Sequence, residues 1–194
     1  LTIRGDLASP PVLANPSGTG FLIDNASVTL HNITVRPSGS SAYGVRVQQP
    51  EVYISSVNVD AGGNITVAGV SIESSRARIT RSSVTVTVAD GIYLSGSYNQ
   101  VDYSSAQANS AAFRAIYAIG GSTNSFSVIL ASNVAGEAFR AYQSHNVTVD
   151  LSTAVSNSPS YALNILTSSG ARVTQTYAFN MDGGALTFNA GADY

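Results

Sequence analysis

Residues 20–47 read GFLIDNASVTLHNITVRPSGSSAYGVRV and contain one complete repeat followed by the start of the next. The stretch begins with GFLI at 20–23 and reaches GVRV at 44–47, so the pattern small, apolar, any residue, apolar occurs twice. Apolar residues two positions apart lie on the same face of a β-strand. The pattern therefore predicts a short strand with one buried face at each place.

The same four-residue pattern begins eight times along the chain, at intervals of 22 to 25 residues. Its first apolar column is Phe21, Val45, Val70, Ile92, Ile116, Phe139, Leu163 and Leu186. Its second apolar column is Ile23, Val47, Ile72, Leu94, Ala118, Ala141, Ile165 and Phe188. Apolar residues make up 44% of the chain, so a full set of sixteen apolar positions indicates a repeat architecture.

A second pattern, apolar-x-apolar-x-x-apolar-x-apolar, follows the first in each repeat. Three repeats carry it clearly, at Val28, Leu30, Ile33 and Val35, at Val52, Ile54, Val57 and Val59, and at Val101, Tyr103, Ala106 and Ala108. The period of two within each half predicts two strands, and the extra residue between the halves predicts a bend. We therefore expect three short strands in each repeat.

The composition excludes several classes of function. The 194 residues include 9 Lys+Arg, all of them Arg, and 11 Asp+Glu, which gives a net charge of −2 without the basic excess typical of nucleic-acid binding. No apolar run approaches the roughly 18 residues of a membrane span, so we expect no membrane insertion. The chain has no Cys, and its His, Asp and Glu residues show no metal-ligand spacing, so we expect no metal and no cofactor.

A period near 23 residues with β-type alternation predicts an all-β solenoid, a parallel β-helix of seven to eight coils. Each coil of such a fold buries its apolar face by stacking on its neighbours. A leucine-rich repeat would need a Leu-x-x-Leu-x-Leu frame with Asn or Cys at a fixed position, which is absent. We expect residues 1–194 to form one β-helix domain, and to be part of a longer chain because the sequence starts at Leu1 and begins and ends within coils.

This repeat, together with the opening LTIRGD at 1–6, resembles the right-handed parallel β-helix of the pectate-lyase-like superfamily along the whole chain. That superfamily includes polysaccharide lyases and hydrolases, bacteriophage tailspikes and autotransporter passengers. The resemblance implies a polysaccharide partner, a location outside the cell, on its surface or on a virion, and a homotrimer if the chain is tailspike-like. The Asp-Asp and Gly-His-Gly motifs of polygalacturonase-type hydrolases and the calcium carboxylates of pectate lyases are missing.

Function must come from side chains that face outward, because inward ones form the core. Coils stack about 4.8 Å apart, so outward residues of successive coils form rows on which a sugar chain can lie. Tyr offers a flat apolar face with a polar tip, and Arg pairs with carboxylates. The predicted carbohydrate-binding row consists of Arg46, Gln48, Tyr93, Tyr117, Arg140 and Tyr142, together with Glu73. The alternative is that these residues only cover an exposed sheet.

Four acidic residues are candidates for catalysis. Asp90 and Glu137 each precede the first apolar column by two positions and lie two coils apart, with Arg114 at the same position between them. Asp24 and Glu73 are also two coils apart. Two coils correspond to about 9.5 Å, near the carboxyl separation of inverting glycosidases. The alternative is a purely structural ladder of alternating charges.

The densest basic cluster, RARITR at 76–81, includes Arg78, which is expected to face outward beside Asp102 and Tyr53. An ion pair on the surface is one interpretation. The other is a contact with an anionic saccharide, since RITR at 78–81 is similar to the Arg-x-x-Arg of pectate lyases.

Two hypotheses of function follow. The first is recognition and depolymerisation of a cell-surface or extracellular polysaccharide. A lyase would use Tyr or Arg to abstract a proton, and a glycosidase would use a carboxyl pair. The second is a non-enzymatic β-helical adhesin or structural spike, in which the same rows bind without turnover.

Overall fold

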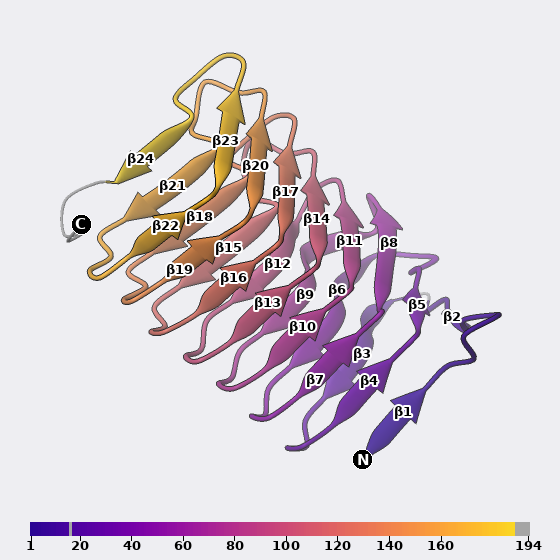
Figure 1. Ribbon diagram of the computed structural model, residues 1–194. Coiled ribbons are helices and arrows are strands. Elements are labelled where there is room, and N and C mark those ends of the chain that lie inside the picture. The colour runs from indigo at the N-terminus through magenta and orange to yellow at the C-terminus, as the bar shows by residue number, and fades with distance from the viewer. Residues whose placement is uncertain (16, 189–194) are drawn as a thin grey trace.

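The computed structural model describes residues 1–15 and 17–188, which form 24 β-strands and no helix. The strands lie in three parallel sheets of eight strands each, and every coil contributes one strand to each sheet in turn. About eight coils stack into a β-solenoid, with β1 at one end of the stack and β24 at the other (Figure 1). The predicted all-β parallel solenoid is therefore confirmed.

We name the sheets A, B and C. Sheet A contains β1 (Thr2–Arg4), β4 (Thr29–His31), β7 (Tyr53–Ser55), β10 (Arg78–Thr80), β13 (Gln100–Asp102), β16 (Ser125–Ser127), β19 (Thr148–Asp150) and β22 (Arg172–Thr174). Sheet B contains β2 (Val12–Leu13), β5 (Thr34–Val35), β8 (Asn58–Gly62), β11 (Ser83–Val86), β14 (Ser105–Ala108), β17 (Leu130–Asn133), β20 (Thr153–Ser156) and β23 (Tyr177–Asn180). Sheet C contains β3 (Gly18–Ile23), β6 (Ser41–Val47), β9 (Ile65–Ile72), β12 (Asp90–Leu94), β15 (Ile116–Ile119), β18 (Phe139–Tyr142), β21 (Leu163–Leu166) and β24 (Leu186–Phe188).

The four-residue pattern lies on sheet C, and its register is the predicted one. Both apolar columns pair position by position from β3 to β24. For example, Val70 lies opposite Val45 on one side and Ile92 on the other. From Val45 to Ile165 the side chains of these columns are buried and form one wall of the core, whereas Leu186 in the last coil is 43% exposed.

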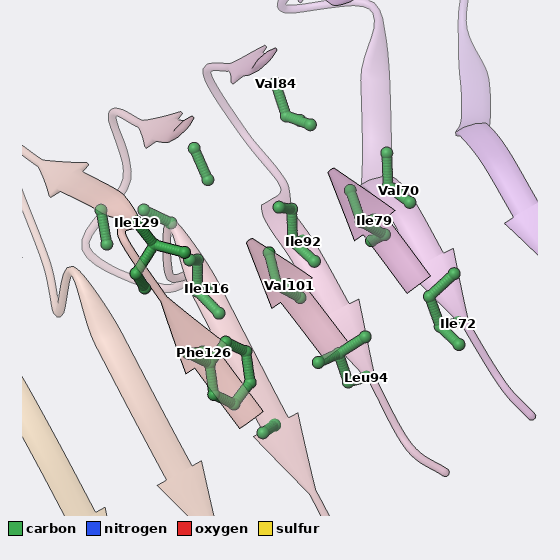
Figure 2. Close-up of a cluster of buried hydrophobic side chains, with 14 of the residues drawn as sticks. Val70, Ile72, Ile79, Val84, Ile92, Leu94, Val101, Ile116, Phe126 and Ile129 are labelled. Atoms are coloured by element: carbon green, nitrogen blue, oxygen red, sulfur yellow. The ribbon is translucent and has the colours of Figure 1, made fainter. Parts of the chain in front are cut away.

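Residues from all three sheets fill the interior of the solenoid. Figure 2 shows Ile92 and Ile116 of sheet C lying near Val101 and Phe126 of sheet A, all of them buried. The rings of Phe126 and Phe139 meet edge to face with centroids 4.8 Å apart, which ties sheet A to sheet C.

The predicted bend between the second and third strands is a single residue with positive φ. This residue is Asn32, Ser56, Arg81, Tyr103, Val128, Leu151 or Gln175 in successive coils, with φ between 46° and 56°. L-residues adopt this left-handed conformation rarely, so the bend is a fixed feature of the solenoid rather than a preference of any one side chain.

The predicted pattern of the fourth coil was wrong at Tyr103. Tyr103 occupies the bend and is 62% exposed, and the buried residues around this bend are Asn99, Val101, Ser104, Ala106 and Ala108. Polar residues can take these inward places because they are hydrogen-bonded. The side-chain amide of Asn99 accepts from the N–H of Ala77 at 2.8 Å, and the Ser104 hydroxyl donates to a backbone carbonyl at 2.7 Å.

Candidate functional site

The outward face of sheet C carries most of the predicted carbohydrate-binding residues. Tyr93 lies opposite Tyr117, and Tyr117 lies opposite Arg140, so three successive coils place these side chains in one row. Arg46 stands in the same row two coils earlier, opposite Ser71. This row therefore carries aromatic and charged side chains at every coil from Arg46 to Arg140 except that of Ser71.

A pocket of about 460 Å³ opens on this face over β6, β9 and β12. It is lined by Tyr43, Arg46, Val67, Ser71, Glu73, Asp90, Tyr93, Ser95 and Phe113. Among the predicted site residues, the pocket gathers Arg46, Glu73, Asp90 and Tyr93. The two acids were each predicted to pair with a different partner, and the fold places them at one pocket instead.

One part of the pocket is a rigid ion pair. The Arg46 guanidinium donates two hydrogen bonds of 2.8 Å to the two carboxylate oxygens of Glu73 and lies 4.7 Å from the centre of the Tyr43 ring. Ser71 and Gln48 also donate to this carboxylate, at 3.1 Å and 3.4 Å. These hydrogen bonds lower the pKa of Glu73, chiefly through Arg46, and the same contact raises the pKa of Arg46. Both groups therefore stay charged over a wide pH range.

Asp90 lies in the opposite kind of environment. It is 6% exposed, and burial raises its pKa to about 6. Burial outweighs the two contacts that favour the charged form, the backbone N–H of Arg114 at 2.7 Å and the Arg114 guanidinium at 3.8 Å. Asp90 is therefore a carboxyl that gains and loses its proton in mildly acidic solution.

Tyr93 contributes to the same pocket as these two carboxyls. Burial raises the pKa of its hydroxyl, and nearby Tyr117, Glu73 and Asp90 act in the same direction. Its ring meets that of Tyr117 edge to face at 5.8 Å between centroids. The Tyr93 hydroxyl thus keeps its proton at neutral pH, where it can donate a hydrogen bond but cannot serve as a base.

A chain of charges continues from the pocket along the coils. Arg114 lies between Asp90 and Glu137, with its Nε 3.7 Å from Glu137 Oε2, and Arg140 lies 3.4 Å from the same oxygen. The Arg114 guanidinium is also 4.3 Å from the centre of the Tyr117 ring. Asn164 donates a further hydrogen bond to Glu137. The predicted pair of Asp90 and Glu137 is thus bridged by an arginine.

The row ends in another stacked contact. The Arg140 guanidinium lies 5.4 Å from the centre of the Tyr142 ring and 5.9 Å from that of Tyr117. Attraction between a cation and an aromatic ring holds such side chains flat against one another. Tyr142 lies two residues beyond Arg140 along β18, opposite Ile119 of β15, and thus extends the aromatic surface sideways.

Two predicted site residues lie elsewhere. Asp24 is exposed and lines a separate small pocket of about 50 Å³ at the first coils. Arg78 lies on sheet A, where its Nη2 is 2.6 Å from Asp102 Oδ2, so the ion pair expected for it is present. The fold does not bring either residue to the sheet C pocket.

Five residues of the pocket were not predicted as site residues: Ser71 and Ser95, which lie in or next to strands of sheet C, and Tyr43, Val67 and Phe113. Tyr43, Val67 and Phe113 lie in or near the connections from sheet B to sheet C. These connections vary in length, and the register of β6 against β3 and β9 shifts between Ser41 and Tyr43. The repeat period therefore cannot place them, although an aromatic residue just before the pattern was a usable signal at Tyr43.

In residues 1–15 and 17–188, no group of three or more His, Asp or Glu side chains could hold a metal ion. The same residues contain no helix of the length and apolarity needed to cross a membrane. Comparisons of the chain with protein-family models, with curated proteins and with solved structures found no match.

Proposed function

We propose that sheet C binds a polysaccharide and that the pocket containing Glu73 and Asp90 hydrolyses it. One observation carries the proposal. A single pocket with the aromatic residues Tyr43, Tyr93 and Phe113 in its lining also holds two carboxyls whose environments move their pKa values in opposite directions. Two neighbouring carboxyls whose pKa values are moved apart in this way are typical of glycosidases, in which one carboxyl donates a proton and the other stays ionised.

Binding would use the row of rings along the coils. Tyr93, Tyr117 and Tyr142 present apolar faces and hydroxyl groups on neighbouring strands of one parallel sheet. Strand spacing in such a sheet is about 4.8 Å, close to the advance of one sugar along a polysaccharide. Aromatic rings favour the apolar faces of sugar rings, and their hydroxyls can bond to the sugar hydroxyls.

Hydrolysis fits the pocket better than elimination does. A lyase needs a base, and the candidates Tyr93 and Arg46 both have raised pKa values, so they hold their protons. Asp90 can instead donate a proton to the leaving oxygen of a glycosidic bond in mildly acidic solution. Glu73 stays ionised and supplies the negative charge that favours the positively charged transition state.

A second candidate function is binding without cleavage, as in an adhesin or spike. One observation favours it: the Glu73 carboxylate already accepts hydrogen bonds from Arg46, Gln48 and Ser71. A carboxylate engaged in this way has little capacity left to activate water. In this case the pocket would be a fixed element of a binding surface.

The proposal is tested by incubating the protein with capsular, lipopolysaccharide and plant glycans at pH 5 to 6 and measuring new reducing ends. We expect cleavage of at least one glycan by the wild type, and loss of cleavage with retained binding for Asp90→Asn. Asp60→Asn, which alters an exposed ion pair on sheet B, is the matched control and should leave cleavage unchanged.

The outcomes separate the two candidates. Cleavage that Asp90→Asn abolishes supports hydrolysis in this pocket. Binding without products, unchanged by Asp90→Asn, supports the adhesin and overturns the catalytic half. If no glycan binds, both are wrong.

A further inference from the structure

We infer that the polysaccharide taken by sheet C is uncharged. The inference rests on the proposed function and narrows it to a class of ligand. Its basis is that each arginine on this face lies within ion-pair distance of a carboxylate of the protein itself.

Three arginines lie on or at the edge of the sheet C face in the described part of the chain, and each contacts a carboxylate. Arg46 makes two hydrogen bonds of 2.8 Å to Glu73. Arg114 lies between Asp90 and Glu137 at 3.8 Å and 3.7 Å, and Arg140 lies 3.4 Å from Glu137. The carboxylate of an acidic sugar would therefore have to compete with a carboxylate of the protein at each of these three arginines.

The remaining six arginines are elsewhere in the fold. They are Arg4, Arg78 and Arg172 on sheet A, Arg36 after β5, Arg76 in the connection before β10, and Arg81 at the bend between sheets A and B. Since the chain has no lysine, no other side chain with a permanent positive charge is left to lie on the sheet C face. Sheet C therefore has the chemistry of a neutral surface.

An anionic sugar would have to displace an existing partner. Taking Arg46 from Glu73 exchanges one charge-assisted pair for another and leaves the Glu73 carboxylate beside the new anion. The side chains of Arg46 and Glu73 are 31% and 24% exposed, so the separated charges would be partly shielded from water. Repulsion between the two anions makes this exchange unfavourable.

A neutral sugar meets none of these obstacles. The cations of this face support the aromatic rings instead, with Arg46 against Tyr43, Arg114 against Tyr117 and Arg140 against Tyr142. The rings are thereby held in place for contact with the apolar face of a hexose. The side-chain hydroxyl of Ser95 in the pocket can bond to a sugar hydroxyl.

The inference is tested by affinity electrophoresis of the wild type in gels that contain either neutral or acidic polysaccharides. The neutral set is β-glucan, mannan, galactan and arabinan, and the acidic set is polygalacturonate, alginate and hyaluronan. We expect retardation by at least one neutral polysaccharide and by none of the acidic ones. The Kd for the neutral ligand, measured by calorimetry, should change by less than about twofold between about 0.05 and 0.5 M NaCl.

A charge-release variant tests the cause directly. Glu73→Gln leaves Arg46 without its carboxylate, so polygalacturonate should retard this variant measurably, although it should not retard the wild type. Asp102→Asn frees Arg78 on sheet A in the same way and should give no gain, because Arg78 lies off the face. Circular dichroism of both variants shows that they are folded.

Each result has one meaning. Selective retardation by neutral polysaccharides, with a gain only for Glu73→Gln, supports the inference. Retardation of the wild type by acidic polysaccharides, salt-dependent binding of the neutral ligand, or the absence of a gain in Glu73→Gln overturns the inference and leaves the proposed function standing. If no polysaccharide of either set, nor any in the broader glycan panel, binds, the proposed function itself is wrong.

Discussion

Gly44 on sheet C packs so closely against Val59 on sheet B that a methyl group on Gly44 would lie 2.7 Å from Val59 Cγ1. Gly20 has the same relation to Val35 in the coil before. In later coils the sheet registers place Ala115 and Ala138 at the glycine position, and alanines such as Ala131 and Ala154 at the valine position. Gly with Val and Ala with Ala are thus alternative ways of filling one corner.

Gly44→Ala should lower the free energy of unfolding by about 2 kcal/mol, because the new methyl group overpacks the corner. It would also lie 2.5 Å from the carbonyl oxygen of Gly69, so the effect has a backbone component. The double variant with Gly44→Ala and Val59→Ala should lose about 1 kcal/mol less unfolding free energy than the sum of the losses of the two single variants. Urea unfolding of the four proteins measures this, and strict additivity would contradict the account of the corner.

The valine at position 128 should lower the stability of the folded protein because of its backbone conformation. It is a β-branched residue with φ of 52°, a conformation that asparagine adopts more readily, and its side chain is partly exposed. Val128→Asn should therefore raise the free energy of unfolding by about 1 kcal/mol. Leu130→Asn, at an exposed position inside β17, is the control and should give no gain. A loss of stability in Val128→Asn would show that the bend is not strained.

Asp90 should make stability depend on pH. The carboxyl has an ordinary pKa of 3.8 and a pKa of about 6 in the folded protein, so its contribution is fully present below pH 3.8 and is lost as the pH rises through 6. Relative to Asp90→Asn, the wild type should lose about 2 to 3 kcal/mol of unfolding free energy between pH 4 and 7.

Glu73 should make stability depend on pH in the opposite direction. Its pKa is lowered below the ordinary 4.5, so its contribution is present above pH 4.5 and is lost as the pH falls through the lower folded value. Relative to Glu73→Gln, the wild type should weaken toward acid. Urea unfolding between about pH 2 and 7 measures both differences, and parallel pH profiles for the two comparisons would contradict the assignment of environments.

The sequence predicted the register of sheet C, but it did not predict that Tyr103 stands at a bend. The two apolar columns recur because each coil must bury the same positions against its neighbours, and their register was predicted throughout. Tyr103 was misplaced because Asn99 and Ser104 occupy inward positions that other coils fill with apolar residues. A hydrogen-bonded polar residue in a core cannot be distinguished from a surface residue by periodicity alone.

The sequence predicted which residues of the candidate site face outward, but it did not predict which of their side chains contact one another. The outward positions of Arg46, Tyr93 and Tyr117 follow from alternation along a strand. The hydrogen bonds of Arg46 to Glu73 do not, because long side chains reach across coils in directions that the repeat does not fix. Phe113 lines the pocket from a connection whose length differs between coils, so the repeat did not predict its position.

The central claim is that the aromatic row of sheet C is the surface that binds a polysaccharide. Tyr93→Ala, Tyr117→Ala and, as a control, Tyr53→Ala on sheet A are compared by calorimetry with the tightest-binding member of the glycan panel. We expect Tyr93→Ala and Tyr117→Ala each to weaken the Kd about tenfold, and Tyr53→Ala to leave it unchanged. An unchanged Kd in both sheet C variants, or an equal loss in Tyr53→Ala, would contradict the claim.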